Sequence, residues 1–139
     1  MENQKDIIEL AREIGRVMQQ EPAYINYNLA KDAADSDEEL QKLISDFNLK
    51  NIKIKAEKAK SEEDRDEEAL RKMNQELRSV YAKIMTNENM MKFNDAKDEF
   101  DLILNRVNAI IQKSSEGEDP NTADYVACSG SCATCGGCG

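Results

Sequence analysis

The chemistry of this chain is concentrated in one short cysteine-rich segment, residues 128–139. All of its cysteines lie there, and three, two and two residues separate them in turn: Cys128, Cys132, Cys135 and Cys138. Thiolates this close in sequence can converge on one centre only if the backbone curls tightly around it. The interleaved glycines allow that curvature, because glycine adopts positive φ without steric cost. We therefore predict that residues 128–139 form a metal-binding tail.

Four roles compete for these cysteines. An iron–sulfur centre is favoured, because cubane clusters are often held by close cysteine runs with two-residue gaps. Zinc is the alternative, although all-cysteine zinc sites usually use two well-separated cysteine pairs. A redox dithiol at Cys135 and Cys138 would lack the following helix that lowers a thiol pKa. The fourth role is an exposed thiol arm that binds no metal or is modified by another enzyme. We predict a 4Fe–4S cluster as cofactor, with zinc as the alternative.

The rest of the composition argues against catalysis and against several partners. The chain has no histidine, which removes the usual general base and every histidine-ligated metal site. A net charge of −9 argues against direct nucleic-acid binding. We found neither a leader-like segment nor an apolar run near the roughly 18 residues that span a membrane. We expect a non-enzymatic, cytoplasmic protein, in a compartment where thiols stay reduced.

The elements that would carry this tail are helices. Charged residues make up 34% of the 139 residues and only two prolines occur, which favours an all-α fold. Apolar residues at three- and four-residue spacing predict helices over about 3–20, 22–35, 36–60, 61–85 and 90–113, with a turn around Thr86 to Asn89. Ser36 with Glu39 is typical of a capping box, and Ser61 before three acids indicates another helix start. We expect an antiparallel helical bundle: the third and fourth helices form a long central hairpin, and the first and last pack at its base.

Charge and composition divide the chain further. A lysine row over 50–60 precedes acids over 62–68, so folding back would set opposite charges against each other. This pattern fits a solvated, charge-complemented hairpin tip, or a docking site for RNA or an acidic partner.

We predict a helical adaptor domain over 1–113, a flexible acidic linker over 114–127 and the tail over 128–139. Because a thin hairpin buries little surface, we also expect a homo- or hetero-oligomer.

The helical pattern resembles the YlbF/YmcA family of small helical regulators from Gram-positive bacteria. The resemblance begins at Glu9-Leu10-Ala11 and spans almost all of residues 1–113. Its further positions are Ile14, Tyr24, Tyr27, Ala30, Glu38-Glu39-Leu40, Leu43, Ile44, Phe47, Asn87, Met90, Phe93, Ala96, Phe100, Ile103, Val107-Asn108 and Ile110-Ile111.

This resemblance implies a regulatory adaptor that binds other proteins. Relatives with such tails form a complex that carries iron–sulfur clusters. That complex influences ribonuclease-dependent RNA processing, competence, sporulation and biofilm formation. The resemblance thus implies that the four cysteines are cluster ligands and that the partners include a ribonuclease complex. Two other functions fit the residues: zinc or iron handling, and a peptide precursor modified on its cysteine tail.

Overall fold

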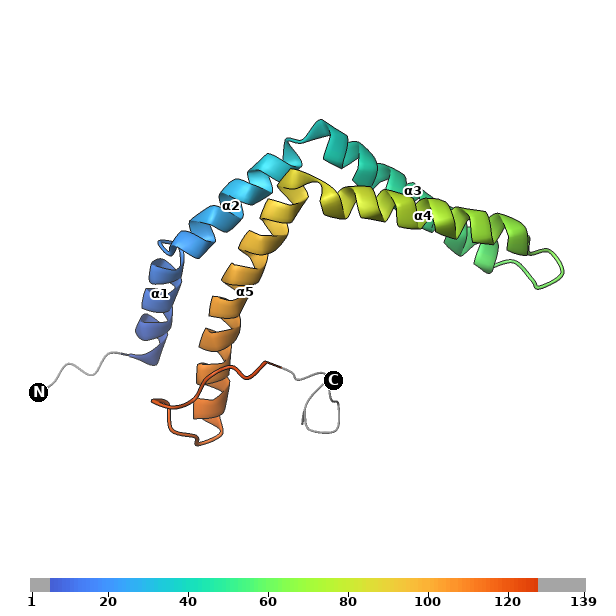
Figure 1. The fold of residues 1–139 in the computed structure, drawn as a ribbon. Helices are drawn as coiled ribbons and strands as arrows, with labels where there is room; N and C mark the ends of the chain where they lie inside the picture. The colour runs from blue at the N-terminus through green and yellow to red at the C-terminus, as the bar shows by residue number, and fades with distance from the viewer. Residues whose placement is uncertain (1–5, 128–139) are drawn as a thin grey trace, which may run out of the picture. The chain divides into compact units, whose positions relative to one another are not determined.

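A computed structural model describes residues 6–127, and these residues form helices joined by short connections (Figure 1). In chain order the helices are α1 (Ile7–Met18), α2 (Pro22–Asp35), α3 (Glu38–Lys58), α4 (Glu67–Thr86) and α5 (Glu88–Ser115). No strand occurs within the described range. The predicted all-α fold is confirmed. None of these helices combines the length and apolar character needed to cross a membrane.

Aspartates, rather than the predicted serines, begin the central helices. Ser36 still has helical backbone angles at the end of α2, and Asp37 caps α3 by accepting from the Leu40 amide. The predicted Ser36–Glu39 capping box is therefore wrong by one residue. The predicted start at Ser61 is also wrong, because Ser61 opens a turn and Asp66 caps α4. A short side-chain acceptor at these positions satisfies an amide that has no partner inside the helix.

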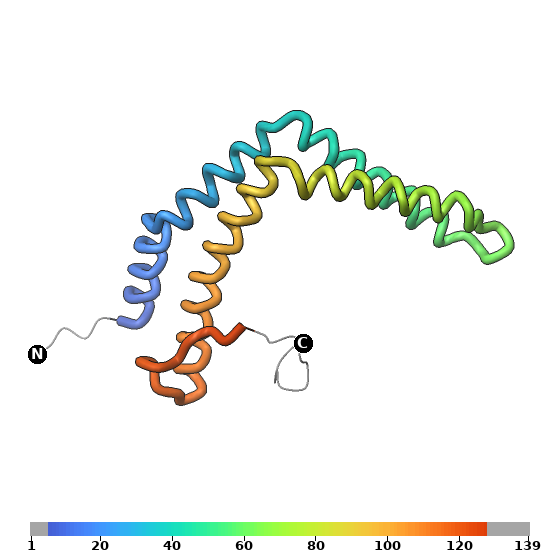
Figure 2. The backbone as a smooth tube through the Cα atoms, viewed as in Figure 1, coloured from blue at the N-terminus to red at the C-terminus, as the bar shows by residue number. Residues whose placement is uncertain are grey.

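Helices α3 and α4 lie side by side as the predicted antiparallel hairpin (Figure 2). Leu40 is fully buried near the base of the hairpin, in one cluster with Ala34, Val80 and Ile84. Partly buried apolar residues pack against this cluster: Leu43, Ile44, Phe47, Met90 and Phe93. Aromatic contacts extend it, with ring centroids 6.0 Å apart for Phe47 and Tyr81 and 5.6 Å apart for Tyr27 and Phe93.

The hairpin tip is organised by one acid and one arginine. Glu57 is buried and its carboxylate accepts from the Asp66 amide at 2.9 Å, while Lys60 lies 2.8 Å from it. Arg65 donates to the carbonyl oxygen of Lys58. The sequence analysis expected the lysines of residues 50–60 to lie against the acids of residues 62–68, but within residues 6–127 no ion pair joins these two groups. Lys50, for example, bridges instead to Asp46 and to Glu76 of the other helix.

The chain divides into two compact units, and the boundary lies within α5, between Asp98 and Glu99. In the first unit, α1 buries none of its side chains, and Ile7 and Val17 are 77% and 57% exposed. The apolar stripe predicted for this helix is present. Within residues 6–127 it is not buried, which differs from the predicted packing of the first helix at the base of the hairpin.

Candidate functional site

The predicted ligands Cys128, Cys132, Cys135 and Cys138 all lie outside the described residues. Within residues 6–127, no group of three or more histidine, cysteine, aspartate or glutamate side chains is placed to hold a metal ion. The described part of the chain therefore provides no competing metal site. The assignment of the four cysteines as iron–sulfur or zinc ligands stays a prediction.

The backbone that leads to the cysteines begins at a well-defined helix end. Gly117 has a φ of 92°, and its amide donates to the Ser114 carbonyl at 3.1 Å. The next amide, that of Glu118, donates to the Lys113 carbonyl at 3.0 Å. This pair of bonds is a Schellman motif, which terminates a helix and satisfies its last carbonyl groups. Glycine suits this position because its φ lies in the left-handed region.

A second set of bonds continues from Asp119. Its side chain accepts from the Asn121 amide at 2.9 Å, and its carbonyl accepts from the amides of Thr122 and Ala123. Ala123 is 8% exposed. The segment predicted as a linker over 114–127 thus starts as the last turn of α5 and continues through a hydrogen-bonded turn.

An arginine–aspartate pair joins this segment to α5. Arg106 Nε donates to Asp124 Oδ1 at 3.0 Å, and Arg106 Nη2 donates to Asp124 Oδ2 at 2.8 Å. Two parallel bonds of this kind fix direction as well as distance, because the planar guanidinium matches the carboxylate. Asp124 lies four residues before Cys128, so this pair positions the backbone just ahead of the predicted ligands.

The electrostatics of the pair favour its charged form. The hydrogen bonds from Arg106, and then that from the Tyr125 amide, lower the pKa of Asp124. The same contact raises the pKa of Arg106. The two side chains are 58% and 42% exposed, so solvent screens the attraction and the pair serves mainly to orient the chain.

A polar junction in the first unit links the starts of two helices. Asp37 caps α3 and also accepts from the side-chain amides of Asn87 at 3.1 Å and Asn89 at 3.0 Å. Asn87 in turn accepts from the Met90 amide and so caps α5. The bonds from the Leu40 amide and from Asn89 and Asn87 lower the pKa of Asp37. This junction fixes how the two long helices of the hairpin connect to their neighbours.

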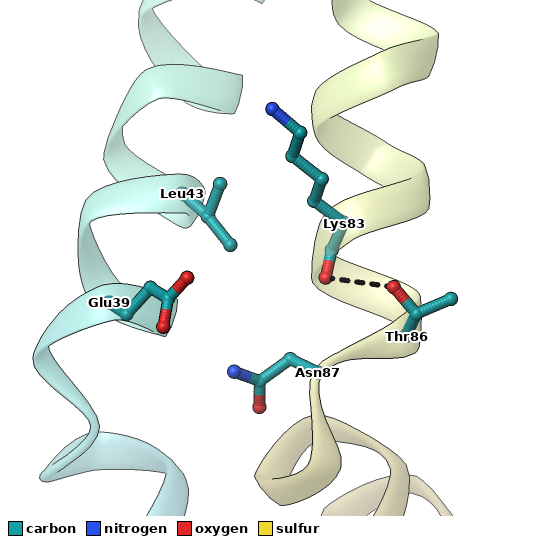
Figure 3. A pocket seen from close by; sticks show the side chains of 5 residues that line it. All are labelled: Glu39, Leu43, Lys83, Thr86 and Asn87. Carbon is teal, nitrogen blue, oxygen red and sulfur yellow. Dashed lines mark hydrogen bonds between the residues drawn. The ribbon is translucent and has the colours of Figure 1, made fainter.

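A shallow pocket of about 310 Å³ opens beside this junction, between α3 and α4 (Figure 3). Leu43 and Glu39 line one wall, and Lys83, Thr86 and Asn87 line the other. The Thr86 hydroxyl donates to the Ala82 carbonyl at 2.8 Å, so its hydrogen is already used. The lining side chains are a mixture of charged, polar and apolar groups. They do not offer a nucleophile with an adjacent base, which a hydrolytic site requires.

The sequence did not indicate the Arg106–Asp124 pair or the polar junction of Asp37, Asn87 and Asn89. Arg106 lies among apolar positions and Asp124 lies in an acidic segment, so each reads as an ordinary solvated charge. The Asn87-Glu88-Asn89 run was a usable signal for the junction, since asparagine is a preferred helix cap. The sequence pattern predicts only a turn there, because the contact of this run with Asp37 is not a local feature.

Comparisons with known proteins identify the helical region. No curated protein and no solved structure matches the chain. A family model described as "Control of competence regulator ComK, YlbF/YmcA" matches residues 7–114. This range starts with α1 and reaches the last turn of α5, so it includes the hairpin, the polar junction and Arg106. The chain belongs to the YlbF/YmcA family.

Proposed function

We propose that the protein is a non-enzymatic regulatory adaptor of the cytoplasm, which binds other proteins through its helical region. The observation that carries this proposal is the family match over residues 7–114, since the family is described by its control of the competence regulator ComK. The wider roles in ribonuclease-dependent RNA processing, sporulation and biofilm formation belong to the same proposal and rest on the family resemblance.

The second part of the proposal is an iron–sulfur cluster on the cysteine tail. Four thiols with short gaps and adjacent glycines are a donor set that suits a 4Fe–4S cluster. The Arg106–Asp124 pair holds the backbone that leads toward these cysteines. When bound, a cluster of this kind supplies a redox- and oxygen-sensitive centre. Cys128, Cys132, Cys135 and Cys138 would hold it.

In this proposal the cluster affects partner binding because it orders the cysteine tail. A site that exists only with its metal couples binding to folding, so the ligated tail presents a different surface from the unligated one. Partner binding would then report the state of the cluster. In this proposal the C-terminal end of α5 carries the tail, and the Schellman motif and the Arg106–Asp124 contact hold the backbone between Gly117 and Asp124.

Purification under oxygen-free conditions tests the proposal against its alternatives. An iron–sulfur adaptor gives brown protein with iron and acid-labile sulfide in comparable amounts. Colourless protein with stoichiometric zinc supports a zinc-handling role instead. A mass shift on the tail of the native protein that is absent from recombinant protein supports a modified peptide precursor.

A further inference from the structure

Helix α3 has a second apolar face that the hairpin does not use. Leu40 and Ile54 of this helix are buried, whereas Leu49 and Ile52 are 58% and 62% exposed. Ala56 is also exposed and follows at the next helical turn. Leucine and isoleucine scattered singly on a surface are ordinary, but here they share one stripe.

The spacing of this stripe is that of a coiled-coil seam. Leu49, Ile52 and Ala56 stand at intervals of three and four residues, which are the core positions of a heptad. Such a seam is covered by the core positions of a second helix. The small Ala56 would let the backbone of that helix approach closely.

The residues that flank the stripe are lysines. Lys53 and Lys55 occupy the two positions beside the core of the heptad, and both are exposed. Neither forms an ion pair with any residue in the range 6–127. Lys50, in contrast, faces the hairpin and is held by Asp46 and Glu76. The chain as a whole carries −9, so this basic border opposes the overall charge.

We propose that this outer face of α3, the residues Leu49, Ile52, Lys53, Lys55 and Ala56, docks an acidic amphipathic helix of a partner protein. Charges beside a seam select the partner, and two lysines select glutamate or aspartate. The proposal rests on the adaptor function, for which it specifies the chemistry of one partner.

Two other occupants fit this face less well. Symmetric pairing with a second copy would place Lys53 and Lys55 against the same lysines, and like charges oppose association. Single-stranded RNA is bound by aromatic side chains on which bases stack, together with cations. This face offers lysine but neither an aromatic residue nor arginine, and its centre is aliphatic.

The test uses two labelled synthetic helices of about three heptads with leucine cores. One, the acidic peptide, carries glutamate at the flanking positions, and the other, the basic peptide, carries lysine there. Fluorescence anisotropy with the full chain should show at least about tenfold tighter binding of the acidic peptide. The variant Lys53→Glu/Lys55→Glu should reverse this preference, and Ile52→Asp should weaken binding of both peptides.

The matched control is Arg71→Glu/Lys72→Glu, which makes the same charge change at exposed positions of α4. It should keep the preference for the acidic peptide. The proposal is overturned if the acidic peptide does not bind, if both peptides bind equally, or if the control loses the preference too. Tighter binding of an unstructured RNA, or self-association that Ile52→Asp abolishes, would also overturn it.

Iron and sulfide measured on the same preparations separate this proposal from the cluster. Protein without iron that still prefers the acidic peptide refutes the cluster and keeps the docking face. Protein with iron and sulfide that shows no preference refutes the docking face alone. Circular dichroism of each variant shows that a loss of binding is not a loss of helix.

Discussion

The buried position of Leu40 leads to a quantitative prediction about stability. This side chain is 0% exposed and lies in the cluster that joins α2, α3 and α4. Leu40→Ala removes buried methyl groups and leaves a cavity, which costs about 3 kcal/mol of unfolding free energy. A small domain has about 5–15 kcal/mol in total, so this is a large fraction. The urea midpoint should fall by about 1–2 M.

The assay is urea unfolding followed by circular dichroism at a helical wavelength, since the chain has no tryptophan. Leu49→Ala is the matched control on the same helix, because Leu49 is 58% exposed. We expect it to change the unfolding free energy by less than about 0.5 kcal/mol. Equal losses for the two variants would refute this assignment of the buried and exposed faces of α3.

Three further predictions concern polar contacts. Asp37 has a lowered pKa, so its carboxylate stabilises the fold above the unfolded pKa of about 4, and this contribution is lost as pH falls through the folded value. Asp37→Asn should therefore flatten the fall in melting temperature between about pH 5 and 3, and an unchanged profile would contradict it. Glu57→Ala should speed amide hydrogen exchange in the hairpin loop 59–66, because the Glu57 carboxylate accepts from the Asp66 amide. Unaltered exchange in this loop would count against that hydrogen bond. Asp124→Ala should speed proteolysis within residues 116–127, because it removes the contact with Arg106. The swap Arg106→Asp/Asp124→Arg should restore much of the protection. Equal digestion of the wild type, the single variant and the swap would exclude a role of the Arg106–Asp124 pair in holding this segment.

The helical fold could be predicted from the sequence because its cause is periodic. Apolar residues at three- and four-residue spacing marked each helix, and the hairpin followed from two long stripes with a charged turn between them. The starts of α3 and α4 were harder to place. Serine is a residue type that often caps helices, but the Ser61 hydroxyl donates a hydrogen bond to the Asp64 carboxylate within a turn. The true start at Asp66 depends on Glu57, nine residues earlier.

The polar contacts that shape the candidate site are not local, which is why the sequence did not reveal them. Asp37 and Asn87 are 50 residues apart, and Arg106 and Asp124 are 18 apart. No spacing rule joins such pairs, because the intervening helix directions decide whether they meet. The cysteines, in contrast, were found from residue type and spacing alone, and their role stays a prediction.

The central claim is that the four cysteines hold an iron–sulfur cluster. Iron and acid-labile sulfide per chain should be measured on oxygen-free wild-type protein and on the variant Cys135→Ser/Cys138→Ser. We predict iron and sulfide in the wild type and a loss of most of both in the variant. Equal iron in the two proteins, or a wild type whose thiols all react as unliganded groups, would contradict the claim.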